Sequence, residues 1–341
     1  MKVMVTGSTG FVGIPLCLEL ARRGATVHAL ARSVSPDHPL QQPRIRLFRG
    51  DILKPESIAA AIDGCDQVYH LAAFTEIWTP EPGLVYKINV EGTRNILDAA
   101  ILAGVKRVVI TSTAGVMGPS PERGAYVDES TNITPYWATE YEKTKRESEK
   151  LAFSYIEKGL DIVVVNPSRV YGPGLIKESN SVVRLVKLYS EGKWRFIPGD
   201  GESVGNYVFI DDVVNGHLLA MERGTPGERY ILGGENLSYN EFFRHVRQAT
   251  GKTQRMFHIP LGPMLFFARW QEWMARIFGK KPLIIPALVE KYTQDWYLSS
   301  DKARKDLGYS ITSFADGLRN TLDWMRRPDG LSSHTRPSTR E

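Results

Sequence analysis

The chain has 341 residues, of which 42% are hydrophobic and 24% charged, and this globular composition excludes disordered and fibrous proteins. Its net charge is +5, but Lys and Arg are interspersed with acidic residues, which argues against a nucleic-acid partner. The two cysteines form no cluster with histidine, so neither a metal site nor a disulfide is expected.

Apolar, strand-like runs alternate with helical segments through the first half of the chain. This alternation predicts an α/β fold with a doubly wound parallel sheet, the Rossmann architecture. The first strand begins at once, leaving no room for a signal peptide, and no run reaches ~18 apolar residues, so we expect a cytoplasmic protein without a transmembrane segment. The expected strands are Val3–Thr6, Thr26–Ala31, Ile45–Arg49, Gln67–His70, Arg107–Ser112 and Asp161–Asn166, and the expected helices are 12–23, 55–63, 84–103 and 139–158.

After Pro167 the alternation loosens, which predicts a second, smaller lobe that binds substrate. The expected domains are a dinucleotide-binding domain over 1–166, a discontinuous substrate lobe over 167–206 and 231–326, and a disordered tail over 327–341. Residues 207–230 are expected to return to the first domain, through a strand at Tyr207–Ile210 and a helix at 211–223. The segment 261–298 has two apolar helical faces, which predicts burial on both sides in a core helix, with a lid, a membrane contact or a subunit contact as alternatives.

A glycine-rich loop joins the first expected strand to the first expected helix. Glycine at such a turn lets the backbone approach a pyrophosphate, and the helix N-terminus supplies N–H groups and partial positive charge. The flanking strand and helix make this pattern more specific than glycine spacing alone. The residues expected to contact the dinucleotide here are Gly7, Thr9, Gly10, Phe11, Val12 and Gly13.

Further cofactor contacts are expected after the next three strands. Arg32 stands where an NAD enzyme would present an acidic residue, and a guanidinium can pair with a 2′-phosphate, so NADP(H) is favoured while NAD(H) can still bind. Asp51 and Ile52 suit the adenine edge. The small or apolar residues expected to lie close to the dinucleotide after the fourth strand are Leu71, Ala72 and Ala73.

The catalytic candidates are a phenol and an ammonium four residues apart on one helical face, Tyr141 and Lys145. A carbonyl under reduction needs a proton on oxygen, and a nearby cation would lower the pKa of the phenol that supplies it. The same spacing occurs at Tyr189 and Lys193, which we expect to be an exposed helix face. Only Tyr141 follows a strand that ends in a hydroxyl cluster containing Ser112 and Thr113.

In this order, the glycine loop, the hydroxyl cluster and the Tyr-x-x-x-Lys pair resemble the extended short-chain dehydrogenase/reductase superfamily, over roughly residues 1 to 325. The resemblance implies that Tyr141 is the general acid/base, that Lys145 activates it and binds the nicotinamide ribose, and that Thr113, or else Ser112, contacts the reacting oxygen. It also implies a proton relay through Asn89 and a homodimer. The expected contacts on the nicotinamide side are Pro167, Ser168 and Val170.

Within that superfamily the chain looks most like dihydroflavonol-reductase-like and hopanoid-associated epimerase-like proteins, a branch whose names do not establish a reaction. We expect an NADP(H)-dependent reductase or dehydrogenase for a small, apolar substrate. One alternative is an NAD-dependent nucleotide-sugar epimerase or dehydratase, against which Gly205 counts because that group has a diphosphate-binding Arg there. Another is a cofactor-sensing protein without turnover. The expected substrate contacts are Phe74, Met117, Tyr136 and Trp137.

Overall fold

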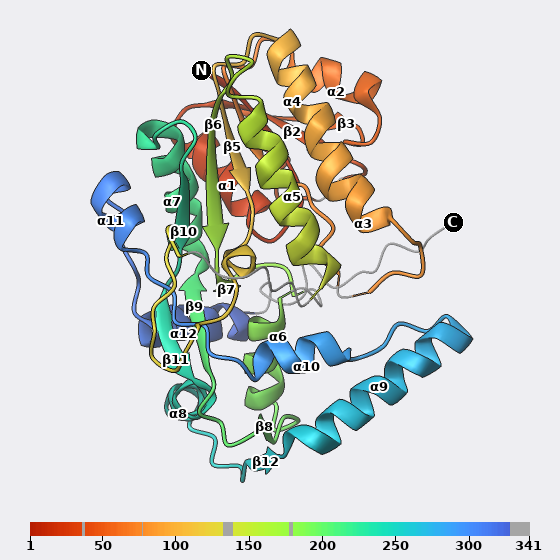
Figure 1. The fold of residues 1–341 in the computed structure, drawn as a ribbon. Coiled ribbons are helices and arrows are strands. Elements are labelled where there is room, and N and C mark those ends of the chain that lie inside the picture. Colours follow the sequence, from red (N-terminus) through yellow and green to blue (C-terminus); the bar gives the residue numbers. More distant parts are fainter. Residues whose placement is uncertain (36–37, 77, 132–138, 177–179, 328–341) are drawn as a thin grey trace.

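A seven-stranded, wholly parallel sheet forms the centre of the larger lobe in the computed structural model, which describes residues 1–35, 38–76, 78–131, 139–176 and 180–327 (Figure 1). Its strand order is β10-β6-β5-β4-β1-β2-β3. This confirms the predicted Rossmann fold, and the six predicted strands lie within a residue or two of their expected bounds. The strands are β1 (Lys2–Thr6), β2 (Thr26–Ala31), β3 (Ile45–Arg49), β4 (Gln67–His70), β5 (Arg107–Thr111), β6 (Asp161–Pro167) and β10 (Arg229–Leu232).

Helices cover both faces of this sheet, as its buried Val- and Ile-rich strands require. On one face α1 (Gly13–Arg22) and α7 (Ile210–Arg223) pack against the strands, with α11 (Asp301–Leu307) beside α7. On the other face lie α2 (Pro55–Ile62), α4 (Gly92–Leu102) and α5 (Glu140–Ser154). The 3-10 turn η2 (Ala114–Met117) follows β5 and carries the chain along the carboxyl edge of the sheet.

The predicted helix over 84–103 is interrupted by a wider turn. Its parts are α3 (Leu84–Tyr86), the π-helical turn η1 (Lys87–Glu91) and α4. Asn89 is fully buried within η1. Such π-turns inside helices are frequent at functional sites, because they re-aim side chains and backbone groups that a regular helix would hold elsewhere.

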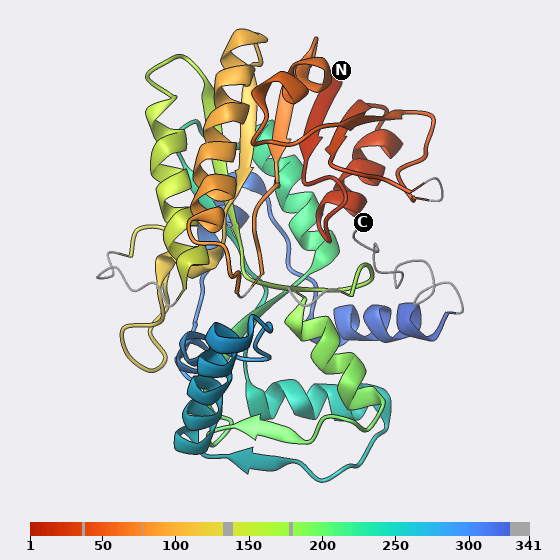
Figure 2. The same ribbon diagram turned by 90° about the vertical axis from the view of Figure 1, so that its right-hand side faces the viewer.

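The smaller lobe is built on a three-stranded sheet of β7 (Arg169–Tyr171), β9 (Val204–Phe209) and β11 (Glu235–Ser238) and on the strand pair β8 (Phe196–Pro198) and β12 (Phe257–Ile259). An aromatic core that includes Phe242 and Phe314 fills it. Figure 2 shows this lobe beneath the large sheet. Its helices are α6 (Ser181–Ser190), α8 (Tyr239–Thr250), α9 (Leu261–Phe278), α10 (Pro286–Tyr292) and α12 (Phe314–Arg326).

The return to the large sheet differs from the prediction. The expected strand at Tyr207–Ile210 forms as part of β9, but it pairs with β7 and β11 in the small sheet. Instead, α7 covers the large sheet and β10 joins it beside β6. A local apolar pattern predicts a strand, whereas its partner depends on distant residues. The tail from residue 328 onward lies outside the described residues.

The prediction that α9 is a core helix is wrong, because only Ala268 and Ala275 of this helix are buried. The large apolar side chains of α9 that are exposed, with their exposed fractions, are Leu261 39%, Phe266 74%, Phe267 46%, Trp270 49%, Trp273 57%, Ile277 54% and Phe278 60%. Figure 1 shows α9 at the margin of the molecule, with α10 along one side. In the described part of the chain, no helix is long and apolar enough to cross a membrane.

Candidate active site

The loop between β1 and α1 is wound so tightly that two of its positions accept only glycine. Gly7 has a φ of +65°, and a Cβ there would lie 2.7 Å from the backbone nitrogen of Ala72. A Cβ on Gly13 would lie 2.1 Å from the carbonyl oxygen of Gly7, to which the Gly10 N–H donates at 2.9 Å. The loop therefore fits a pyrophosphate at the α1 N-terminus. The other predicted contacts here are partly buried: Thr9, Phe11 and Val12.

Arg32 is exposed at the carboxyl end of β2, directly after buried Ala31. It makes no hydrogen bond or ion pair with another described residue, so its guanidinium is free to meet a phosphate. Asp51 is partly buried beyond β3, and one carboxylate oxygen accepts from the Leu53 N–H at 3.0 Å. Ile52 is buried against α4, where a Cβ on Gly92 would meet its Cδ1. The assignment of Asp51 and Ile52 to the adenine side stays a prediction.

A chain of buried hydrogen bonds supports the sheet edge behind the cofactor loop. The Thr93 hydroxyl donates to the Asn89 carbonyl at 2.7 Å, so His70 Nε2 donates to Thr93 at 3.0 Å, and Nδ1 then accepts from the Thr6 hydroxyl at 2.7 Å. Burial, followed by the charge of Lys145, lowers the pKa of His70 to about 3, which keeps the ring neutral. The predicted contacts that follow β4 are partly buried beside this network: Leu71, Ala72 and Ala73.

Tyr141 and Thr113 come together at the carboxyl edge of the sheet, as predicted from their order in the sequence. Tyr141 lies in the first turn of α5, near the side chain of Thr113, which directly follows β5 and Ser112. Burial, aided by the neighbouring Glu142 carboxylate, raises the pKa of Tyr141, while the Thr113 hydroxyl opposes the rise. The free phenol is therefore protonated at neutral pH and poised to donate a proton.

Lys145 lies one helical turn after Tyr141 and is 1% exposed. Burial lowers its pKa to about 8, although the Glu149 carboxylate acts to raise it. Glu149 is itself fully buried and accepts from Asn166 Nδ2 at 2.7 Å and from Arg146 at 3.1 Å. Burial dominates the pKa of Tyr141 in the protein without cofactor, and the expectation that Lys145 lowers this pKa stays a prediction.

Asn89 holds two parts of the site in place through its side chain. Its Oδ1 accepts from the Phe74 N–H at 2.8 Å, and its Nδ2 donates to the Thr144 hydroxyl at 3.0 Å. It thus connects the loop after β4 to α5, between Tyr141 and Lys145. Both polar atoms of the amide are occupied by this bridge, which is a positioning role, and the proposed proton relay stays a prediction.

Two hydroxyls near the reacting groups lack partners among the described residues. The Oγ atoms of Ser112 and Ser168 are buried without a hydrogen bond. An unsatisfied buried hydroxyl costs about 1–3 kcal/mol, so such atoms are suited to a ligand. Ser168 also donates its N–H to the Leu232 carbonyl at 3.2 Å, which fixes the link between β6 and β7 to β10. The predicted neighbours Pro167 and Val170 lie in β6 and β7 on either side of it.

The four predicted substrate contacts differ in where the structure places them. Phe74 is partly buried beside Asn89. Met117 is only 6% exposed and packs in a small apolar cluster with Val127 and Leu298, so the structure gives no support to a substrate contact there. Tyr136 and Trp137 lie outside the described residues.

The pair at Tyr189 and Lys193 was expected on an exposed helix face, which is wrong for the tyrosine. Tyr189 is buried in the core of the small lobe, with its ring 5.7 Å from that of Phe243, and α6 ends at Ser190, before Lys193. The two side chains therefore do not form a second Tyr-Lys site.

Sequence analysis missed the positive charge that lies beside Gly205. A Cβ on Gly205 would lie 2.3 Å from Nη1 of Arg169, which reaches over from the neighbouring strand β7. The absence of an arginine at 205 therefore does not leave this place uncharged, so Gly205 alone does not count against a diphosphate. The sequence alone does not reveal that Arg169 lies beside Gly205, because their proximity depends on how β7 pairs with β9.

Residues 3–233 match the family model described as "NAD dependent epimerase/dehydratase family". The chain belongs to this family. Its relatives place it in the extended short-chain dehydrogenase/reductase branch, which confirms the resemblance seen in the motifs. The protein is thus an NAD(P)-dependent oxidoreductase of the extended type.

Among curated proteins, the family member is similar to a putative dihydroflavonol 4-reductase from Synechocystis, with 33% identity over 94% of each chain. It is 31% identical to sterol demethylase protein B of Methylococcus capsulatus, over 96% of this chain and 98% of the relative. A 2-alkyl-3-oxoalkanoate reductase from Stenotrophomonas maltophilia is 30% identical, over 94% of this chain and 98% of the relative.

Among solved structures, this family member is similar to a UDP-glucose 4-epimerase from Thermotoga maritima determined with UDP-glucose. The TM-score is 0.79 and the identity 25%, over 96% of this chain and 99% of the epimerase. Reductases and epimerases therefore share this fold, and the choice between their reactions depends on the site.

Proposed function

We propose that the protein is a cytoplasmic, NADP(H)-dependent reductase that interconverts a carbonyl and an alcohol on a small, largely apolar substrate. The observation that carries this proposal is the meeting of Tyr141 and Thr113 at the carboxyl edge of the sheet, where the Thr113 hydroxyl acts on the pKa of the phenol, with buried Lys145 one turn further along α5. Two relatives named for a sterol and for a 2-alkyl-3-oxoalkanoate support an apolar carbonyl substrate. The test is an absorbance assay with NADPH and NADH over a panel of apolar ketones and aldehydes.

The nicotinamide cofactor, when bound, supplies or accepts a hydride. The protein's own residues handle the proton. In the reductive direction the neutral phenol of Tyr141 donates a proton to the developing alkoxide, while the Thr113 hydroxyl orients that oxygen. The Lys145 ammonium, held in a buried setting beside Glu149, stabilises the phenolate that remains. Asn89 fixes the helix that carries both residues.

Cofactor choice follows from the exposed guanidinium of Arg32. NADPH should bind about ten- to a hundredfold more tightly than NADH, because one charge-assisted arginine–phosphate contact is worth about 1.5–3 kcal/mol. Arg32→Ala should remove most of this preference. Dissociation constants for both cofactors at fixed, low ionic strength measure it, since salt screens a surface contact. Arg44→Ala is a matched control, because Arg44 is also exposed but precedes β3, at the amino edge of the sheet, whereas Arg32 lies at the carboxyl edge. Equal affinity of the unmodified protein for the two cofactors would refute the preference.

The epimerase alternative retains specific support, from the UDP-glucose 4-epimerase likeness and from the guanidinium beside Gly205. A nucleotide-sugar epimerase would hold NAD tightly through its cycle. Cofactor that co-purifies with the protein as NAD would therefore favour this alternative, whereas release and exchange of NADP(H) favour the reductase. Saturable cofactor binding without turnover would favour the cofactor-sensing protein.

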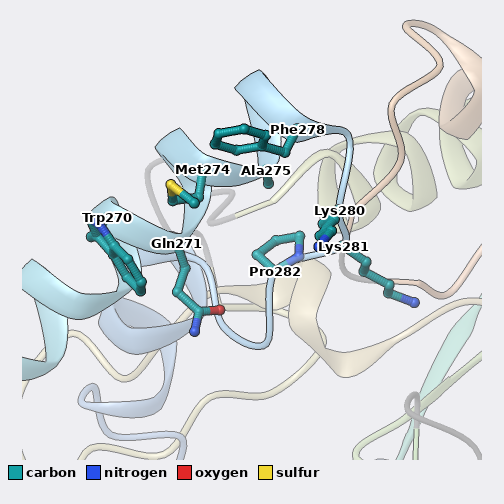
Figure 3. A pocket seen from close by; sticks show the side chains of 8 residues that line it. All are labelled: Trp270, Gln271, Met274, Ala275, Phe278, Lys280, Lys281 and Pro282. Carbon is teal, nitrogen blue, oxygen red and sulfur yellow. The ribbon is translucent and has the colours of Figure 1, made fainter.

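The exposed face of α9 supports contact with an anionic lipid surface, which would also bring an apolar substrate to the protein. Phe266, Trp270, Trp273 and Ile277 are exposed together with the cations Arg269 and Arg276, the composition of helices that lie in a membrane interface. Trp270, Met274 and Phe278 line a pocket of about 330 Å³ together with Lys280, Lys281 and Pro282. Figure 3 shows these side chains.

Co-sedimentation with vesicles tests this contact. Vesicles that contain phosphatidylserine should retain the protein, and the double variant Trp270→Gln/Trp273→Gln should lose at least tenfold in partition, because two large apolar side chains no longer enter the interface. Leu102→Gln is the control, since Leu102 is 88% exposed at the end of α4. If the double variant instead abolishes a dimer seen by light scattering and leaves vesicle binding unchanged, α9 is the subunit contact of the expected homodimer.

A further inference from the structure

Arg169 is a cation enclosed by tyrosines. Its guanidinium carbon lies 5.0 Å from the ring centre of Tyr292, 5.5 Å from that of Tyr207 and 6.0 Å from that of Tyr239. Nη1 donates to the Tyr207 hydroxyl at 3.3 Å. Nη2 is buried and has no hydrogen-bond partner in the described structure. Aromatic faces attract the charge but satisfy none of its planar donors.

This guanidinium has no anionic partner among the described residues. The groups that act on its charge are the three tyrosines, and none of the ion pairs in the described part of the chain includes Arg169. Burying the N–H donors of an arginine without a carboxylate partner costs free energy of folding. The unpaired Nη2 therefore marks the place of an anion that the protein itself does not supply.

The position of Arg169 relates it to the reacting groups. It directly follows Ser168, whose buried Oγ also lacks a partner, on the nicotinamide side of the sheet edge. Tyr292 belongs to α10, and the preceding Lys291 forms an ion pair with Glu142, the residue after Tyr141. The guanidinium thus lies at the junction of the lobes, between the nicotinamide-side strand and the helix that contacts the start of α5.

Space for the guanidinium comes from one glycine. Gly205 stands on β9 two residues before Tyr207, which pairs with Arg169 in the β7–β9 register, and any side chain at 205 would collide with Nη1. We propose that Arg169 binds an anionic group of the substrate, a carboxylate or a phosphate, at its unpaired Nη2. This inference rests on the proposed function and deepens it, because it gives the apolar carbonyl substrate a negatively charged group.

Calorimetry on the NADPH-loaded protein tests the proposal with three small probes: hexanoate, hexyl phosphate and the neutral methyl hexanoate. At least one anion should bind at least tenfold more tightly than the ester, as expected for a bidentate arginine contact, and the tighter anion identifies the group. Arg169→Met should reduce anion affinity to that of the ester. Arg244→Met is the control, because Arg244 is an exposed arginine of the same lobe.

Two further variants keep the test decisive if Arg169→Met fails to fold. Arg169→Lys retains the charge but not the planar fork, and Gly205→Ala displaces the guanidinium without removing it, so both should weaken anion binding. Anion binding that equals ester binding in the unmodified protein, or that survives in all three variants, overturns the proposal.

A separate readout distinguishes this inference from the proposed function. Reduction of a neutral ketone by the unmodified protein tests the proposed function, because a neutral substrate carries no group for Arg169. Loss of anion selectivity in Arg169→Met, together with that reduction by the unmodified protein, supports both proposals. Micromolar binding of UDP-glucose that requires Arg169 would support the anion site and overturn the apolar reductase.

Discussion

Tyr141→Phe should lower turnover by ~10² or more while the affinity for NADPH stays nearly unchanged. The variant removes only the phenolic proton, and general acid catalysis of this kind contributes about 10²–10⁴-fold. Burial raises the pKa of Tyr141 above its ordinary value, so the phenol carries the proton to be donated at neutral pH. Steady-state rates with any ketone accepted by the unmodified protein, together with cofactor titration by fluorescence, measure the two quantities.

The chain offers a matched control in Tyr189→Phe. Tyr189 has the same four-residue spacing to a lysine but is buried in the core of the small lobe, so its variant should keep full turnover. Equal activity of Tyr141→Phe and the unmodified protein would end the assignment of Tyr141 as the acid.

Lys145→Met should separate activity from stability. Turnover should fall by ~10² or more and NADPH should bind more weakly, because one ammonium contacts the ribose and stabilises the phenolate. In the protein without cofactor, however, the free energy of unfolding at pH 7 should rise by up to about 3 kcal/mol. Burial lowers the pKa of Lys145 from 10.5 to about 8, so the folded state bears a desolvation cost that methionine removes.

The stability difference between Lys145→Met and the unmodified protein should depend on pH. Between about pH 8 and 10.5 the unfolded chain holds a proton on Lys145 that the folded chain does not, so raising the pH stabilises the unmodified protein relative to the variant. The stability gain of Lys145→Met is therefore full below pH 8 and shrinks toward pH 10.5. Urea unfolding of both proteins across this range measures it. A variant that is less stable at pH 7, with no trend in pH, would contradict the buried-charge account.

Local patterns were sufficient to predict the large sheet and its helices. The six strands and the glycine turn at Gly7 and Gly13 follow from apolar runs, helix periods and backbone sterics that act over few residues. The π-turn around Asn89 did not follow, because it depends on the buried contacts of Asn89 with Phe74 and Thr144. The place of β9 in the small sheet did not follow either, because an apolar strand can pair equally well in either of the two sheets.

The positions of Tyr141, Lys145 and Thr113 at the sheet edge followed from their order in the sequence, whereas their surroundings did not. Their catalytic roles stay predictions. Arg169 was missed because its contact with Gly205 depends on the register between β7 and β9, which the sequence does not show. The burial of α9 was overestimated, since apolar periodicity shows that a helix has an apolar face but not what covers it.

The chain passes between the lobes repeatedly, from β6 into β7, from β9 back into α7, and from β10 out to β11. A fragment that ended at residue 166 would contain six strands of the large sheet without α7 or β10. Val109, Val163 and Val165, which pack in the same cluster as Val213 and Leu218 of α7, would then be exposed to water. The cofactor-binding half is thus not separable by truncation, and both lobes should unfold in one cooperative transition.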